Sequence, residues 1–356
     1  MADDYFPPPE SEGGWRWLAT PEDVREVGGV DAAKLRLAAE WNALQASTTS
    51  SLVVIRRGHL VAEYHELSAL ATTRFDIWSC TKSFTSIAYG VLFRERPGLG
   101  LDTPVYEHLP EGQPLTDPRK ARITLGHLLT MTSGIPGESI GIGAVPTRTG
   151  VGPFEAALGF EPTWARRWGE SRSAATLSAD PGTFWDYSDP AFAHLGMAFT
   201  KLTRRQMRDY MAEKVFDPIG IESTSWDLQG VGTRFGPHTN AHTGVHVSAR
   251  ELARFGYLML RGGRWRDRQI VPREWVEQAT RPSQTLNPSY GLAWWTNGNG
   301  TLWPGLPRDA FACLGLHCNA CYVVPSLDLV VARTGNGPVS WPSDGLLGKV
   351  VAAVDP

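Results

Sequence analysis

The sequence predicts an α/β (α+β) fold, in which an antiparallel sheet from both chain ends is flanked by helices and carries an inserted, mostly helical lobe. Strand-like segments rich in Val, Ile and Leu occur near both termini, at residues 51–65 and 320–335. Helical patterns dominate between them, and the one after Trp78 is apolar enough to be buried. Strands at both ends with helices in the middle imply that the two ends share one sheet.

The size of the chain allows one large folded unit. It has 356 residues, 42% hydrophobic and 20% charged, which is the composition of a globular protein with a sizeable core. We expect an α/β lobe from residues 1–95 and 231–356, and a helical lobe with long loops from residues 96–230. Together the lobes would form a single catalytic unit.

The N-terminal part contains a helix, a hairpin and a second helix. "DAAKLRLAAEWNALQ" has apolar residues at helical spacing, and "SLVVIRRGHLVAEYH" is typical of two strands around Arg57-Gly58. After Trp78, apolar residues recur at positions 84, 87, 88, 91 and 92. This i, i+3, i+4 pattern predicts a buried helix.

The middle and the C-terminal part alternate between helices and strands. "TLGHLLTMT" and "HLGMAFTKLTRRQMRDYMAEKVF" are helical patches, and "SARELARFGYLML" is a helix with a capping box formed by Ser248 and Glu251. Strands are expected at "YGLAWWT", "ACYVVP" and "LDLVVARTG", the last two joined at Pro325-Ser326. These strands would complete the sheet begun at the N-terminus.

Charge and composition exclude several kinds of partner. A formal charge of -3 gives no electrostatic reason to expect nucleic acid or an acidic membrane surface. No apolar run approaches the ~20 residues of a membrane span. The N-terminus carries Asp3 and Asp4 where a secretory signal would be basic, and three of the four cysteines crowd into residues 313–321. We expect a cytoplasmic protein that acts on a small molecule; a homodimer is compatible with these features.

Two serines compete as the candidate nucleophile. Ser139 lies in "GESIG", which matches the G-x-S-x-G pattern, but that pattern requires a strand before the serine and a helix after it. The Gly- and Pro-rich residues around Ser139 favour a loop instead. Ser79 lies in "FDIWSCTKSFTS", at the start of the predicted buried helix.

Ser79 and Lys82 are three residues apart, so their side chains lie on the same face of that helix. A neighbouring amine or cation can turn an unreactive hydroxyl into a nucleophile. The helix N-terminus adds partial positive charge beside the developing anion. The chain has only six lysines, and a buried helix does not ordinarily begin with an ammonium, so this pair predicts a serine-based active site.

These segments resemble a known family. "WSCTKSFTS" is similar to the nucleophile motif of the S-x-x-K serine hydrolases related to class C β-lactamases and penicillin-binding proteins. "ITLGHLLTMTSGI", "FWDYSD", "SARELARFGYLMLRGGRW" and "YVVPSLDLVV" resemble later segments of that family in the same order, over about residues 5–340. The resemblance is nearest to the esterase and 6-aminohexanoate-dimer hydrolase branch. It implies a β-lactamase/transpeptidase-like fold and an acyl-serine intermediate, with no metal or organic cofactor.

The resemblance also implies roles for individual residues. Ser79 would be the nucleophile, Lys82 its activating partner, and Tyr187 the general base or proton shuttle, since a nearby ammonium lowers the ~10 pKa of a phenol. Where the family usually has Asn, this chain has Asp189. Near Lys82, that carboxylate would keep the lysine protonated as a fixed cation and oppose a Tyr187 phenolate. The lost amide donor implies weak or absent β-lactamase activity.

The third motif of the family is placed at "GLHCN", residues 315–319, on a strand that lines the site. The backbone N–H of Leu316 would complete an oxyanion hole with that of Ser79, and His317 would face the substrate. Cys318 and Asn319 stand where the dimer-hydrolase branch often has Gly and Gln. "HTG" at residues 242–244 imitates the same motif, but it precedes the Ser248 helix and is interpreted as a decoy.

Other functions stay open at this point. Cys313, His317, Cys318 and Cys321 suggest a zinc or redox site at 313–321, although strand alternation would place Cys318 and Cys321 on opposite faces. A catalytically inactive binding relative and an acyltransferase on the same fold are further alternatives.

Aromatic residues give a modest indication of the substrate. Trp185 belongs to a group with Phe160, Trp164, Trp168 and Phe184 in the region leading to Tyr187. If these rings line the site, they favour an apolar or aromatic acyl or alcohol group.

Overall fold

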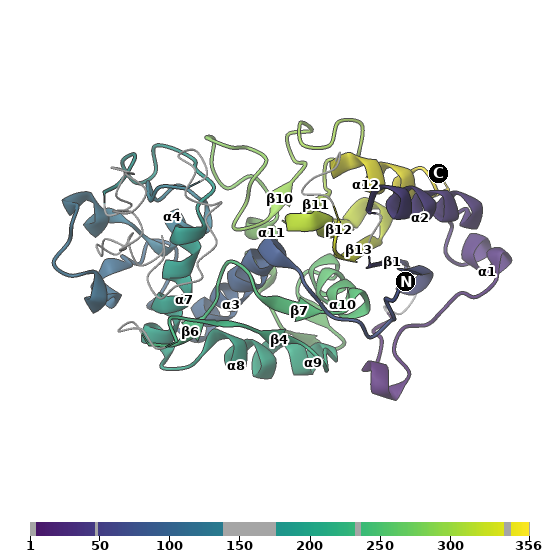
Figure 1. The fold of residues 1–356 in the computed structure, drawn as a ribbon, viewed down its shortest axis with the longest axis horizontal. Coiled ribbons are helices and arrows are strands. Elements are labelled where there is room, and N and C mark those ends of the chain that lie inside the picture. Colours follow the sequence, from purple (N-terminus) through teal and green to yellow (C-terminus); the bar gives the residue numbers. More distant parts are fainter. Residues whose placement is uncertain (1–4, 47–48, 138–175, 232–235, 338–342, 356) are drawn as a thin grey trace.

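The computed structural model describes residues 5–46, 49–137, 176–231, 236–337 and 343–355. Its centre is a six-stranded antiparallel sheet in the order β10-β11-β12-β13-β1-β2 (Figure 1). The strands are β1 (Ser50–Arg56), β2 (His59–Glu66), β10 (Trp295–Thr296), β11 (Phe311–Gly315), β12 (Asn319–Val324) and β13 (Leu329–Gly335). Ser50 pairs with Gly335, so the first strand lies beside the last. The predicted sheet from both chain ends is confirmed.

The two faces of the sheet pack against different helices. Val53 and Ile55 of β1 belong to a core shared with α3 (Thr81–Glu95) and α10 (Ala249–Leu260), whereas Leu52 and Val54 face the core formed with α2 (Ala32–Ala46) and α12 (Ser343–Val351). Alternate side chains of a strand point to opposite faces, which produces this division. Figure 1 shows α2 and α12 side by side near the described ends of the chain, with α3 and α10 across the sheet from them.

Except for α7, the remaining elements are short. The other helices are α1 (Pro21–Glu26), α4 (Leu125–Leu129), α7 (Asp189–Thr203), α8 (Met207–Met211), α9 (Asp217–Ile219) and α11 (Arg273–Ala279). The minor strands are β3 (Phe75–Asp76), β4 (Ser225–Trp226), β5 (Leu228–Gln229), β6 (His238–Thr239), β7 (Val245–Val247), β8 (Arg264–Trp265) and β9 (Arg268–Gln269). In the described ranges, no helix combines the length and apolar character needed to cross a membrane.

Helix α3 carries the predicted Ser79–Lys82 region into the core. Its residues from Thr81 to Leu92 are buried, and the ring of Phe84 stacks on Phe255 of α10 with centroids 3.7 Å apart. Helix α10 begins with the predicted capping box: the Ser248 hydroxyl accepts from Glu251 N–H, and the Glu251 carboxylate accepts from Ser248 N–H, each at 3.3 Å. This packing holds the start of α3 against the sheet.

The strand expected at "YGLAWWT" is much shorter than predicted. Only Trp295 and Thr296 join the sheet, as β10. Ala293 has a φ of 62°, its N–H donates to the Leu129 carbonyl, and its own carbonyl accepts from the Ser83 hydroxyl. These contacts with distant elements bend the backbone out of the strand conformation, which local alternation in the sequence does not reveal.

A buried polar network fixes the start of α7. His194 Nδ1 lies 2.6 Å from the Pro190 carbonyl, and its Nε2 lies 2.9 Å from the Tyr106 hydroxyl. A carbonyl only accepts, so Nδ1 carries the hydrogen and Nε2 accepts from Tyr106 when the ring is neutral. Burial lowers the pKa of His194 from 6.5 to about 4. The folded protein therefore holds this imidazole in its neutral form.

This network predicts that the protein loses stability in mild acid. Between pH 6.5 and about 4 the unfolded chain binds a proton at His194 that the folded chain excludes, so the free energy of unfolding falls as the pH is lowered. The full effect is about 3 kcal/mol. In urea unfolding at pH 7 and pH 5, His194→Gln should show a smaller loss than the wild type. His59→Gln, at a partly exposed hairpin histidine, is the control, and equal losses in all three proteins would contradict the prediction.

Candidate active site

Ser79 lies at a strained turn between β3 and α3. The 3₁₀ turn Trp78–Cys80 precedes α3, and the Asp76 carboxylate accepts from Trp78 N–H at 2.8 Å and from Gly244 N–H at 3.2 Å. Trp78 has a φ of 50°, which is unusual for a bulky residue. Ser79 is partly exposed, whereas Ile77 and Cys80 on either side are buried. The turn therefore presents one hydroxyl at the start of a buried helix.

Lys82 is buried and has three acceptors for its ammonium group. Its Nζ lies 2.9 Å from Ser79 Oγ, 3.2 Å from the His242 carbonyl oxygen and 2.7 Å from Asp189 Oδ1. The first two contacts are hydrogen bonds, and the contact with Asp189 is an ion pair. In this arrangement Ser79 Oγ accepts a hydrogen bond from Lys82. The nearby Asp189 carboxylate favours the ammonium form of Lys82 over the free amine.

Asp189 is the anionic partner of that cation. Burial is the largest single influence and would raise the pKa of its carboxyl, but the charge and hydrogen bond of Lys82, together with the neighbouring His242, lower the pKa below 3.8. Asp189 is also the first residue of α7, where the partial positive charge of the helix N-terminus favours a carboxylate. The structure therefore places the Asp189 carboxylate next to Lys82, which is the position whose consequences were predicted from the sequence.

Tyr187 lies beside Lys82. Lys82 Nζ is 4.8 Å from the centroid of the Tyr187 ring. That ring stacks on Trp295 of β10 at 6.2 Å with an interplanar angle of 16°, and Trp185 contacts both rings at 6.4 and 6.2 Å. An aromatic group of three rings thus stands beside the ammonium. The role of Tyr187 as a base stays a prediction.

The end of β11 packs directly on the Ser79 turn. A Cβ added at Gly315 would lie 2.1 Å from the Ile77 carbonyl oxygen and 3.2 Å from Cys80 N. The φ of Gly315 is -135°, which any residue can adopt, so space and not backbone conformation requires glycine here. This contact fixes how far residue 316 stands from Ser79.

A family model described as Beta-lactamase matches residues 37–355. The chain belongs to the β-lactamase family of serine hydrolases. The 6-aminohexanoate-dimer hydrolase of Paenarthrobacter ureafaciens is 24% identical over 346 residues, covering 91% of this chain and 80% of that protein.

Two solved structures are similar to this chain. EstCE1, described as a hydrolase with promiscuous acyltransferase activity, has a TM-score of 0.67 at 16% identity, covering 91% of this chain and 98% of that one. A family VIII carboxylesterase has a TM-score of 0.64 at 16% identity, covering 90% and 97%. At these identities the likeness shows the fold, and the predicted β-lactamase/transpeptidase-like fold is confirmed.

In this β-lactamase-family protein, residues 315–319 do not form one continuous strand. Gly315 ends β11, Asn319 begins β12, and the residues between them form a turn in which His317 and Cys318 have φ values of 59° and 62°. The prediction of a single strand is wrong because the segment reverses direction. Leu316 is the exposed residue of the turn.

The residues of this turn mainly contact the neighbouring backbone and the ring of Trp78. His317 Nδ1 donates to the Gly337 carbonyl at 2.9 Å, and its ring lies edge-on to Trp78 at 5.5 Å. Asn319 is buried, and its side-chain amide donates to the carbonyls of Leu316 and Gly335 at 2.7 and 3.1 Å. Cys318 is also buried. Asn319 and Cys318 are therefore buried parts of this turn, and their predicted roles in substrate binding stay predictions.

The cysteines are arranged differently from the proposed zinc or redox motif. Cys80, Cys313 and Cys321 are fully buried, and the thiols of Cys80 and Cys321 donate to the carbonyls of Asn319 and Leu252 at 3.4 and 3.6 Å. Cys318 lies in the turn between β11 and β12 and is also buried. Among the residues that the structure describes, no group of His, Cys, Asp and Glu could hold a metal ion.

His242 is the site residue that the sequence analysis missed. Its "HTG" segment is not the strand motif, yet the loop before β7 runs along α3, where Thr85 donates to the Ala241 carbonyl and Lys82 to that of His242. Burial lowers the pKa of His242 to about 4, so the ring beside Asp189 and Lys82 is neutral at pH 7. The sequence could not have indicated the contact with Lys82, because it is made by the backbone carbonyl of His242. Ser139 lies outside the described residues.

The Gly315 contact predicts a large effect of one methyl group. Gly315→Ala should push the β11 end away from the Ser79 turn by roughly an ångström, which can cost about 10²-fold in rate. The measurement is kcat/KM for a p-nitrophenyl ester, with a thermal melt to verify folding. Gly98→Ala, at a glycine with no heavy atom within 4 Å of an added Cβ, is the matched control. Full activity in Gly315→Ala would show that this contact does not set the site geometry.

Proposed function

We propose that this protein hydrolyses an ester or linear amide bond of a small molecule through an acyl-Ser79 intermediate. The observation that carries the proposal is the position of Lys82 Nζ, 2.9 Å from Ser79 Oγ and 2.7 Å from Asp189 Oδ1. A hydroxyl next to a buried cation can develop negative charge at low cost. The relatives include an amide hydrolase and a carboxylesterase, so both bond types belong to the proposal.

In the proposed mechanism Lys82 does not move a proton. Ser79 Oγ attacks the substrate carbonyl carbon, and Tyr187, which must enter the step as a phenolate beside the Lys82 ammonium, takes the hydroxyl proton. The Lys82 ammonium stabilises the charge that develops on Ser79, and the backbone N–H groups of Ser79 and Leu316 donate to the oxyanion. Tyr187 then protonates the leaving group. Water attacks the acyl-Ser79 ester by the same steps, which releases the acid and restores the enzyme.

Aromatic rings support an apolar, uncharged substrate. Trp185 and Trp295 contact Tyr187 beside Lys82, and Trp78 directly precedes the nucleophile. Such rings favour a flat or apolar acyl or alcohol group. The charge of Lys82 is balanced by Asp189, so this pair offers no excess charge to an ionised substrate.

A substrate panel tests the proposal. p-Nitrophenyl acetate, butyrate and benzoate, nitrocefin and a short ω-amino-acid amide should be compared at pH 7 with the wild type and Ser79→Ala. We expect turnover of the neutral esters, most strongly butyrate or benzoate, and little or none of nitrocefin. Nitrocefin as the best substrate would contradict the proposal. A protein that neither turns over the panel nor reacts with a fluorophosphonate would be an inactive binding relative.

An acyltransferase is distinguished in the same assay. Added methanol or a primary amine competes with water for the acyl-Ser79 ester. Hydrolysis predicts that free acid remains the main product, as measured by chromatography. A predominant methyl ester or amide at low concentrations of the acceptor would assign the protein to acyl transfer instead.

A further inference from the structure

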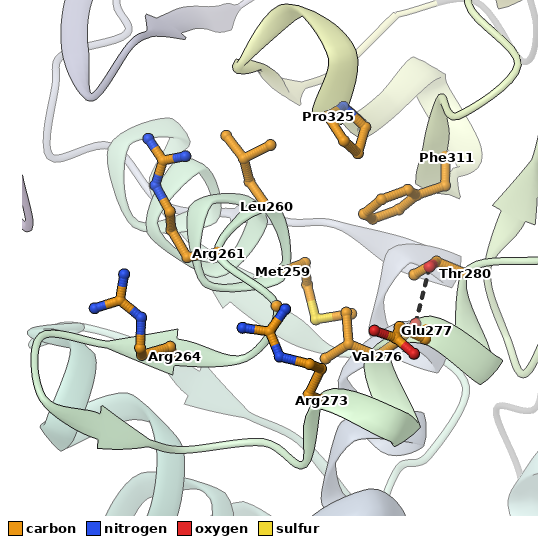
Figure 2. Close-up of a pocket in the computed structure, with 11 residues that line it drawn as sticks. Met259, Leu260, Arg261, Arg264, Arg273, Val276, Glu277, Thr280, Phe311 and Pro325 are labelled. Carbon is orange, nitrogen blue, oxygen red and sulfur yellow. Dashed lines mark hydrogen bonds between the residues drawn. The ribbon is translucent and has the colours of Figure 1, made fainter. Parts of the chain in front are cut away.

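A pocket lies between the end of α10, helix α11 and the start of β11. Its volume is about 370 Å³, within the range of small-molecule sites. Figure 2 shows the residues that line it, which are Met259, Leu260, Arg261, Gly262, Arg264, Arg273, Val276, Glu277, Thr280, Phe311 and Pro325. None of them belongs to the proposed active site.

The lining is apolar on one side and cationic on the other. Met259, Val276 and Phe311 are buried and contribute the apolar wall, which Leu260 and Pro325 extend. In Figure 2 the side chains of Arg264 and Arg273 lie across the space from Phe311 and Pro325. A ligand with one charged end and one apolar end matches this division.

The arginines differ in how far their charge is already balanced. Arg261 pairs with Asp328 at 2.9 Å and lies over the Tyr257 ring. Arg273, the first residue of α11, has no carboxylate partner among the described residues. Its Nη1 would lie 3.1 Å from a Cβ at Gly262, so the guanidinium lies close over the turn that ends α10. Arg273 is therefore an available cation beside the pocket.

The other charged group limits the charge of the ligand. Glu277 lies four residues after Arg273 on α11 and lines the same pocket. Of the three arginines that line the pocket, Arg261 pairs with Asp328, and Arg264 donates to the Arg266 carbonyl and lies over the Phe6 ring. Arg273 therefore offers its charge to one anionic group, and the Glu277 carboxylate would repel a dianion. A guanidinium binds a carboxylate through two parallel hydrogen bonds.

We propose that this pocket binds a small monocarboxylic acid with an apolar or aromatic body. The carboxylate would pair with Arg273, and the body would lie against Val276 and Phe311. At the ~30 Å³ of one water-sized group, 370 Å³ accommodates about a dozen non-hydrogen atoms. Octanoate and phenylpropanoate have this size and charge. The inference is independent of the proposed function, because no residue of the pocket takes part in the Ser79 chemistry.

Isothermal titration of octanoate into the full-length protein tests the proposal. Arg273→Gln should weaken binding at least tenfold, whereas Glu277→Gln should tighten it severalfold by removing the repelling charge. Arg268→Gln, at an exposed arginine on β9 that does not line the pocket, should bind as the wild type does. All three substitutions are on the surface, and a thermal melt verifies that each variant folds.

Two other ligands complete the test. Octanol and acetate, which each lack one of the two features, should bind at least tenfold more weakly than octanoate. Unchanged octanoate affinity in Arg273→Gln, or equal affinity for octanol, would overturn the proposal. Displacement of octanoate by an equal concentration of inorganic phosphate would also overturn it, because the arginines would then attract anions in general.

Discussion

Ser79→Ala is expected to lower kcat for a p-nitrophenyl ester by about 10⁴-fold or more, because loss of the nucleophile removes the covalent route altogether. The fold should remain intact, since Ser79 is partly exposed and its hydroxyl accepts one hydrogen bond from Lys82. A thermal melt close to that of the wild type would show that the loss is chemical. kcat from initial rates at saturating ester is the measurement.

Ser139→Ala is the matched control, because the G-x-S-x-G pattern nominates that serine by sequence alone. It should retain nearly full activity. Mass spectrometry after fluorophosphonate treatment should place the adduct on the peptide that contains "SCTK". Equal losses in both variants, or an adduct on the Ser139 peptide, would mean that the nucleophile has been assigned to the wrong serine.

The parts of the fold that could be predicted are those in which local periodicity and burial agree. The β1–β2 hairpin, α2, α3 and the capped α10 each follow from the spacing of their apolar residues. Their pairing also follows from strands at both chain ends. The failures occur where long-range contacts decide the backbone. Ala293 leaves the strand conformation through bonds to Leu129 and Ser83, which no local pattern encodes.

The residues of the candidate site also fall into those that could be predicted from the sequence and those that could not. Ser79 and Lys82 are one helical turn apart, so their 2.9 Å contact follows from the sequence spacing. Asp189 was identified through the family resemblance and lies at Lys82. His242 was missed because it reaches the site through its backbone carbonyl, which has no sequence signature. The turn at 316–318 was missed because His317 and Cys318 adopt positive φ values without glycine.

The Lys82–Asp189 pair has a proposed catalytic role and a structural role, and the two can be separated by mutation. Lys82→Met should lower kcat/KM by about 10²–10⁴-fold, since it removes the only cation in contact with Ser79 among the described residues. It also leaves Asp189 as a buried charge without its partner, which typically costs ~3–5 kcal/mol. Both losses would appear in the single variant.

The double variant Lys82→Met/Asp189→Asn distinguishes these roles, because the second change removes the unpaired charge. Its free energy of unfolding in urea should return most of the way to the wild-type value, while kcat/KM stays low. If activity returned together with stability, Lys82 would serve only to balance Asp189. Asp189→Asn alone should keep the cation and much of the activity, because an amide oxygen can still accept from Lys82. If Lys82 acts as a fixed cation, Asp189→Asn should keep much of the activity. If Lys82 acts as the base, Asp189→Asn should raise the activity of the enzyme, because the carboxylate that keeps the lysine protonated is removed.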